Sequence, residues 1–229
     1  MTKIRTITAV ALCILGLQAA AKADTILLSS YATGTTNPGA GNTATFYVPT
    51  ASTVNTAVDT TYNVSPGTTW HPAIGNSSYV SYNPNTAPGG SVVAPNGDYV
   101  YRSYFDLSAE QAASSMGTMT VLADDAVAIT LNGNLILAAA APMGPADSYS
   151  HCAETGPNCL TPTTFDFAGL VAGQNVLTFD VKQVNLVNEG LDYSGAISAV
   201  AVPEPASIAL LGSGLLGIAG FYRRRLNLN

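Results

Sequence analysis

The sequence predicts an all-β fold, an antiparallel β-sandwich of the jelly-roll type, placed between two apolar terminal segments. Short runs with a period of two recur along the middle of the chain, which is the pattern of half-buried strands. Turns rich in Gly, Pro and Asn separate these runs, and almost no helical periodicity appears. The terminal segments are indicated by a third observation, because each end combines an uncharged apolar run with basic residues.

The first 23 residues have the three parts of a secretory signal peptide. A basic start at residues 3–5 precedes an apolar stretch at residues 7–17, and Ala21-Lys22-Ala23 forms a cleavage signal. We therefore expect signal peptidase to cut between Ala23 and Asp24, so that the mature chain begins at Asp24.

Strands are predicted where apolar residues alternate with polar ones. In residues 175–182 the apolar positions are Leu177, Phe179 and Val181, so one face of this strand is expected to be buried. Residues 98–107 repeat the pattern, and Asn132-Gly133 predicts a two-residue hairpin turn inside residues 126–137. Further strands are expected at residues 25–31, 44–48, 79–82, 116–123 and 194–200, and one short helix, N-capped by Ser108, at residues 108–115.

Charge is distributed unevenly along the chain. Six of the eight Lys and Arg residues lie in the terminal segments, whereas thirteen of the fourteen Asp and Glu residues lie in the body. The body therefore has a formal charge of −11, with Arg102 and Lys182 as its two cations. Nucleic acids and anionic membrane surfaces attract basic patches, so neither is an expected partner of the body.

Two cysteines remain in the body, Cys152 and Cys159, in a segment rich in turn residues. In an oxidising compartment outside the cytoplasm they are expected to form a disulfide. A metal site with His151 is the alternative, but two thiols and one histidine make an incomplete zinc ligand set.

Asp124 and Asp125 lie between two predicted strands. As neighbours in a strand they would point to opposite faces, which does not suit a pair of facing catalytic carboxyls. In a turn, their oxygens can join backbone carbonyls around Ca²⁺, so a calcium site at these two residues is one hypothesis. The alternative is a solvated turn, in which Asp is a common residue.

The aromatic residues near the single tryptophan raise the question of sugar binding. Trp70, His71, Tyr79 and Tyr82 can form a platform on which a sugar ring stacks, because such side chains combine an apolar face with a polar tip. The alternative is that these residues belong to the core and its rim.

Sequence motifs of catalysis are absent from the body, which contains no G-x-S-x-G, no H-E-x-x-H and no P-loop. His71 is followed by a proline in a predicted loop and is interpreted as a structural residue rather than a base. The expectation is a protein without catalytic residues.

Residues 206–222 form an uncharged run of 17 residues that is followed at once by Arg223, Arg224 and Arg225. As a helix this run is about 25 Å long, slightly less than a hydrocarbon core of about 30 Å. An uncharged helix next to a basic cluster is typical of a membrane span whose cluster stays in the cytoplasm. The prediction is a C-terminal transmembrane helix in the cytoplasmic membrane, and the alternative is a buried core helix.

The segment that starts at Val202 resembles the PEP-CTERM sorting signal. The resemblance is carried by Pro203, Glu204 and Pro205, then the apolar run, then the arginine cluster, in the order that the family shows. It implies processing by an exosortase-like enzyme and delivery to the cell envelope or extracellular matrix. Without the family, the two prolines predict an extended joint before the helix, and a plain linker is the alternative.

The body resembles the galactose-binding-like jelly rolls over about residues 70–200. Three stretches carry this resemblance: "YRSYFDL" at residues 101–107, the Asp124-Asp125 pair before Asn132-Gly133, and "LVAGQNVLTFDV" at residues 170–181. The resemblance implies a β-sandwich, which is a fold that hosts many functions.

These features predict three parts: a signal peptide at residues 1–23, a β-sandwich domain at residues 24–201 and a sorting segment at residues 202–229. We expect a non-catalytic exported protein, anchored in the inner membrane as a precursor and then located in the cell envelope or extracellular matrix. Binding of extracellular polysaccharide is one expected role. A purely structural role in the exopolysaccharide matrix is the alternative, and a carbohydrate-active hydrolase is a third hypothesis.

Overall fold

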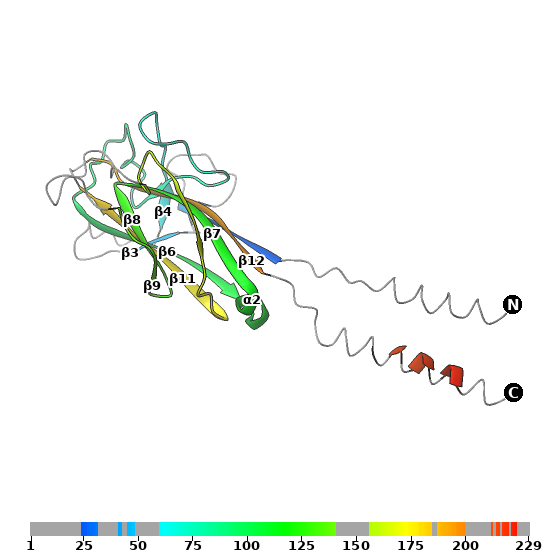
Figure 1. Ribbon diagram of the computed structural model, residues 1–229. Coiled ribbons are helices and arrows are strands. Elements are labelled where there is room, and N and C mark those ends of the chain that lie inside the picture. Colours follow the sequence, from blue (N-terminus) through cyan, green and yellow to red (C-terminus); the bar gives the residue numbers. More distant parts are fainter. Residues whose placement is uncertain are drawn as a thin grey trace. The chain divides into compact units, whose positions relative to one another are not determined.

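The computed structural model describes residues 24–31, 41–42, 45–48, 60–140, 156–184 and 187–199, together with residues 212, 214–215, 217–219 and 221–223. The unit Asp24–Ala199 consists mainly of strands in two antiparallel sheets (Figure 1). The all-β, antiparallel prediction is therefore confirmed, while the jelly-roll topology stays a prediction. The elements are β1 (Asp24–Ser29), β2 (Gly41–Asn42), β3 (Phe46–Val48), β4 (Thr61–Asn63), β5 (Val80–Ser81), β6 (Gly97–Leu107), α2 (Ala109–Ser114), β7 (Ser115–Asp124), β8 (Ala126–Leu131), β9 (Asn134–Leu137), β10 (Thr163–Phe167), β11 (Gly173–Gln183) and β12 (Gly190–Ala199).

The seven-stranded sheet is organised around β12. Its order is β10-β7-β12-β5-β4-β2, and β1 pairs with β12 beside this path. On one side, β12 pairs with β7 along its whole length; on the other side, it pairs with β1 and, at Leu191, with β5. β12 is therefore an interior strand although it lies last in the body.

The five-stranded sheet has the order β3-β6-β11-β8-β9, with β11 at its centre. β6 and β11 pair over residues 97–107 and 173–183, and β8 pairs with the other edge of β11. The predicted hairpin turn between β8 and β9 is confirmed, because Asn132 and Gly133 have φ values of 52° and 81°. Positive φ at both positions is what a type I′ turn requires.

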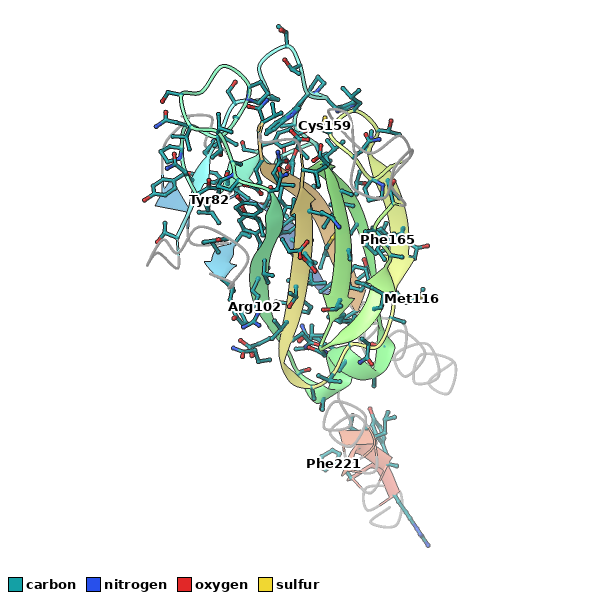
Figure 2. The ribbon with its side chains drawn as sticks, turned by 90° about the vertical axis from the view of Figure 1, so that its left-hand side faces the viewer. Tyr82, Arg102, Met116, Cys159, Phe165 and Phe221 are labelled. Carbon is teal, nitrogen blue, oxygen red and sulfur yellow. The ribbon has the colours of Figure 1, made fainter. Side chains whose placement is uncertain are left out.

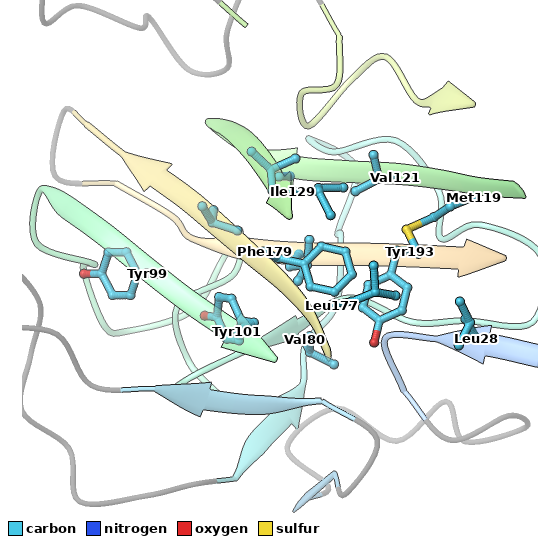
Figure 3. Close-up of a cluster of buried hydrophobic side chains, with 14 of the residues drawn as sticks. Leu28, Val80, Tyr99, Tyr101, Met119, Val121, Ile129, Leu177, Phe179 and Tyr193 are labelled. Carbon is cyan, nitrogen blue, oxygen red and sulfur yellow. The ribbon is translucent and has the colours of Figure 1, made fainter. Parts of the chain in front are cut away.

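The main hydrophobic core lies between the two sheets (Figure 3). Alternate residues of β11 face inward, and among them Phe179 stacks on Tyr193 of β12 with 4.3 Å between ring centroids. Because both rings are fully buried, this pair joins the two sheets at their centres. The period-two pattern of the sequence thus packs one face of each sheet against the other.

The short helix also follows its prediction. α2 has Ser108 as its N-cap, and Gln111 completes a capping box with it. Three strands were not expected from the sequence, β2, β4 and β10, and β12 starts at Gly190 rather than at residue 194.

The first and last residues of the sandwich lie opposite each other. Asp24 at the start of β1 is the register partner of Ala199 at the end of β12. Both terminal segments of the chain are therefore joined to the same end of the seven-stranded sheet.

The predicted transmembrane helix at residues 206–222 falls largely outside the described residues. Those that are described between residues 212 and 223 are helical. Within the part of the chain that the structure describes, no helix is both long and apolar enough to cross a bilayer.

Candidate functional site

The four residues predicted to form a sugar platform do not form an exposed surface. Trp70 and Tyr82 are each 4% exposed and Tyr79 is fully buried, whereas His71 is half-buried. The rings of Trp70 and Tyr79 pack against each other with 4.8 Å between centroids. A sugar ring would have to displace this packing, so the structure corrects the platform prediction and places these rings in the interior.

Trp70 belongs to a second, smaller core on the outer side of the seven-stranded sheet. Leu122 of β7 points away from the main core and joins the buried residues of this cluster. The indole ring of Trp70 lies over Gly190, where a Cβ atom would come within 2.7 Å of it. The cluster consists of Val64, Trp70, Tyr79, Ala87, Leu122 and Cys159.

Asp124 and Asp125 are buried, which corrects the interpretation of a solvated turn. Asp124 Oδ2 accepts a hydrogen bond of 2.8 Å from Trp70 Nε1, and Asp125 Oδ2 accepts one of 2.8 Å from the backbone N–H of Val184. Burial raises the pKa of Asp124 well above its usual range, and the neighbouring Asp125 carboxyl raises it further. Both of these hydrogen bonds therefore come from neutral donors.

The calcium hypothesis for this pair gains no support from the surrounding residues. Within the described residues, no group of three or more His, Cys, Asp or Glu side chains is arranged to hold a metal ion.

Asp192 on β12 fixes the loop that follows Trp70. Its Oδ1 atom accepts hydrogen bonds from Ser30 Oγ at 2.9 Å and from Ser77 Oγ at 2.5 Å. Its Oδ2 atom accepts a bond of 2.8 Å from the backbone N–H of Ile74. Burial raises the pKa of Asp192, while these donors act in the opposite direction. One carboxyl thus connects strand β12 to three positions distant in the sequence.

Glu189, directly before β12, is a fully buried acidic side chain. Its Oε1 atom accepts a hydrogen bond of 2.8 Å from the Tyr101 hydroxyl, and its Oε2 atom accepts one of 2.5 Å from Ser81 Oγ. Thr86 Oγ1 in turn donates to Ser81 Oγ at 2.6 Å. Burial raises the pKa of Glu189 to about 8, so the carboxyl holds its proton at neutral pH.

A cluster of buried tyrosines lies beside Glu189. Tyr82 stacks on Tyr99 with 5.1 Å between ring centroids, and the ring centroids of Tyr47 and Tyr101 are 5.6 Å apart. The Tyr99 hydroxyl donates to the backbone carbonyl of Pro95 at 2.7 Å. These rings provide apolar area, and their hydroxyl groups satisfy buried acceptors.

The acidic network is structural in its arrangement. A glycosidase needs two carboxyls that a substrate can reach, one on each side of the scissile bond. Asp124, Glu189 and Asp192 are instead buried, and each accepts hydrogen bonds from the protein itself. Sequence reasoning missed Glu189 and Asp192, because it began the last strand after both.

The outer face of the five-stranded sheet is the exposed polar surface that the sequence indicates most directly. Arg102, Tyr104 and Asp106 alternate along β6 with inward-facing residues, and Tyr104 is 42% exposed. Figure 2 shows Arg102 beside this strand. The alternation predicted for residues 98–107 puts all three residues on one face, so the sequence contained a signal for Tyr104.

Several predicted site residues lie outside the described residues: Ala23, Cys152, Pro203, Glu204, Pro205, Arg224 and Arg225. Arg223 is helical and exposed. Asp24, the expected first residue after cleavage, begins β1. Cys159 is 1% exposed, and its pairing with Cys152 stays a prediction.

Two solved structures are similar to this chain at low TM-scores. One is a native structure of a family 35 carbohydrate-binding module from Clostridium thermocellum, with 13% sequence identity, a TM-score of 0.31, and coverage of 76% of this chain and 97% of that chain. The other is the isomalto-dextranase of Arthrobacter globiformis T6 complexed with panose, with 11% identity, a TM-score of 0.30, and coverage of 76% of this chain and 23% of that chain. At these scores the likeness carries no conclusion, and the galactose-binding-like resemblance stays a prediction.

No curated protein matches the chain significantly. One family model does match, and it covers residues 201–225, directly after the sandwich. The chain therefore carries a PEP-CTERM protein-sorting motif in this segment.

Proposed function

We propose that this chain is a non-catalytic, exported β-sandwich protein, which the segment at residues 201–225 directs to the cell envelope or extracellular matrix. The observation that carries the proposal is the match of that segment to the PEP-CTERM protein-sorting motif. An exosortase-like enzyme is the partner that such a motif implies, and signal peptidase is the partner expected at Ala23.

The position of the two ends of the sandwich supports this proposal. Because Asp24 lies opposite Ala199, both expected processing regions join the folded unit at one end of one sheet. A single folded body can thus remain attached to both terminal segments without distortion of its strands. In the proposed precursor, residues 206–222 hold this end of the sandwich at the inner membrane until the tail is processed.

The absence of catalysis is likewise a proposal, and the buried carboxyls support it. Glu189 and Asp192 are fully buried, and Asp124 is nearly so. Their hydrogen bonds to Tyr101, Ser77 and Trp70 tie loops to strands. These acids are thus buried polar groups that are satisfied by hydrogen bonds within the protein, which is typical of a structural role.

A substitution in the motif tests the sorting proposal. Replacing Pro203-Glu204-Pro205 by three alanines removes the extended joint but leaves the apolar run and the arginines unchanged. We expect the variant to accumulate as an inner-membrane precursor, detected by fractionation and immunoblotting. The control changes the exposed Thr161-Pro162 turn of the body to Ala-Ala and should be sorted normally. Normal release of the tail variant would contradict the proposal.

A purely structural role is the second candidate. Leu27 and Met116 are 71% and 60% exposed on the outer face of the seven-stranded sheet, on strands that flank β12. Exposed apolar side chains on a sheet face favour self-association. Concentration-dependent assembly of the exported protein without any added glycan would support this role.

A further inference from the structure

The outer face of the five-stranded sheet carries an exposed aromatic side chain, Tyr104. Among the described side chains of the sandwich, Tyr104 is the one aromatic residue that is exposed rather than buried or half-buried. It projects from β6 on the side opposite to the inward-facing Tyr101 and Phe105. The exposed aromatic ring of the sandwich is therefore Tyr104, which the sequence analysis did not single out, and not Trp70.

Four polar side chains and Val176 lie around Tyr104 in regular rows across the paired strands. Tyr104 lies opposite Val176, Arg102 lies opposite Thr178, and Asp106 lies opposite Gln174. Neighbouring strands are about 4.8 Å apart and successive rows about 6.6 Å apart, so these side chains form one continuous surface. We call this surface the Tyr104 face, and it consists of Arg102, Tyr104, Asp106, Gln174, Val176 and Thr178.

The chemistry of the Tyr104 face matches that of a sugar polymer. A sugar ring has an apolar face of C–H groups, which packs on an aromatic ring, and a rim of hydroxyls that both donate and accept hydrogen bonds. Arg102 supplies donors, Asp106 supplies acceptors, and Gln174 supplies both. Tyr and Arg are also the residue types that most often dominate binding energy at protein interfaces.

Charge selects a neutral ligand over an anionic one. Arg102 and Lys182, the two cations of the body, project from the same side of the five-stranded sheet as Asp98, Asp106 and Asp180. This side is therefore close to neutral in a body of net charge −11. An anionic polymer would be repelled by the rest of the molecule, whereas a neutral one would not.

The shape of the surface favours an extended chain. The Tyr104 face occupies residues 102–106 and 174–178 of two paired strands of 11 residues each, and Tyr104, Asp106 and Gln174 are exposed on it, so it is an open strip rather than an enclosed site. Both terminal segments are joined to the other sheet, at Asp24 and Ala199, and neither starts from this face. A long polymer can thus lie along the strip in several registers, which is suited to a matrix of repeating units.

We propose that the Tyr104 face binds an extended, neutral polysaccharide chain, with a sugar ring stacked on Tyr104 and its hydroxyls bonded to Arg102, Asp106 and Gln174. This inference rests on the proposed export, because export brings the face into contact with extracellular polysaccharide.

Affinity electrophoresis of the exported protein in native gels tests the inference. The gels contain a neutral polysaccharide, either galactomannan or dextran, or the anionic polysaccharide alginate. We expect at least one neutral gel to retard the wild-type protein, and we expect Tyr104→Ala to weaken the apparent affinity at least tenfold. Tyr104→Phe keeps the ring and should retain most of the retardation. Met116→Ala, at an exposed position on the opposite sheet, is the matched control and should migrate like the wild type.

Three results would overturn the inference: no retardation by either neutral polysaccharide, wild-type retardation of Tyr104→Ala, or retardation by alginate alone. The thermal midpoint of each variant shows that the fold is intact, since Tyr104 is exposed. The sorting experiment tests the proposed export independently of binding. Normal sorting without binding contradicts the Tyr104 face only, whereas binding by a protein that remains in the cytosol contradicts the proposed export only.

Discussion

At the scale of single residues, the sandwich is notable for buried acids whose hydrogen-bond donors are neutral. Glu189 is bonded to Tyr101 and Ser81, and Asp192 to Ser30, Ser77 and a backbone N–H. Burial disfavours the charged form of a carboxyl, and neutral donors compensate for this only in part. The pKa values of Glu189 and Asp192 are therefore raised, which couples the stability of the domain to pH.

Glu189 gives the clearest pH prediction. Its pKa is raised from 4.5 to about 8, so between these values the folded protein holds a proton that the unfolded chain releases. The contribution of Glu189 to the free energy of unfolding should thus be largest below pH 4.5 and fall as pH rises towards 8, by at most about 1.4 kcal/mol per pH unit. Urea unfolding between pH 5 and pH 8 measures the slope.

Glu189→Gln removes the titration but keeps an acceptor for the Tyr101 hydroxyl. The slope of stability against pH should become shallower in this variant. Asp106→Asn, at an exposed site on β6, is the control and should leave the slope unchanged. If Glu189→Gln keeps the wild-type slope, the pH dependence does not come from Glu189.

Single residues also show where sequence reasoning succeeds and fails. Alternation along β6 is a local signal, and it places Tyr104 outside and Tyr101 inside. The burial of Trp70 depends on contacts that are remote in sequence, with Gly190 and Asp124. No local pattern contains that information, so an exposed platform and a core position looked alike in the sequence.

At the scale of elements, β12 organises one end of the sandwich. It forms the middle of the seven-stranded sheet, and Glu189 and Asp192 at its start hold the preceding loops. The loop from residue 64 to residue 79 covers the outer side of this sheet and encloses the second core. The loop is therefore attached to the seven-stranded sheet mainly through buried polar groups and through the ring contact between Trp70 and Tyr79.

Asp192→Asn tests this attachment. The substitution places an amide N–H₂ group where one carboxylate oxygen accepts a bond, so a buried donor loses its partner at a cost of about 1–3 kcal/mol. Hydrogen exchange measured by mass spectrometry should be faster in residues 64–79 of the variant than in the same residues of the wild type. Exchange in β11 should not change. Asp166→Asn on the exposed edge strand β10 is the control and should not change exchange in that loop. If residues 64–79 of Asp192→Asn are as well protected from exchange as in the wild type, Asp192 does not hold this loop.

The elements themselves differ in how far the sequence reveals them. The turn at Asn132-Gly133 and the helix cap at Ser108 depend on neighbouring residues alone, and both were predicted. β4 has only three residues, too few for a visible alternation. β10 does alternate at Thr163, Phe165 and Phe167, but it follows a turn-rich segment and was missed.

At the scale of the whole molecule, the seven-stranded sheet receives both terminal segments and the five-stranded sheet presents the Tyr104 face. The pairing of Asp24 with Ala199 separates these two roles, because it confines both attachments to one sheet. Composition predicted an acidic β-rich body, and the terminal motifs predicted its sorting. The sequence did not reveal which sheet carries the ends, since that depends on the pairing of the first strand with the last.

Mass spectrometry of the intact protein recovered outside the cytoplasm tests the central claim, which is export followed by processing at both ends. The account predicts a chain that begins at Asp24 and has lost part of the segment after Pro203, with Cys152 and Cys159 together two protons lighter than the free thiols. A full-length chain from Met1 to Asn229, found in the cytosol with free thiols, would contradict it.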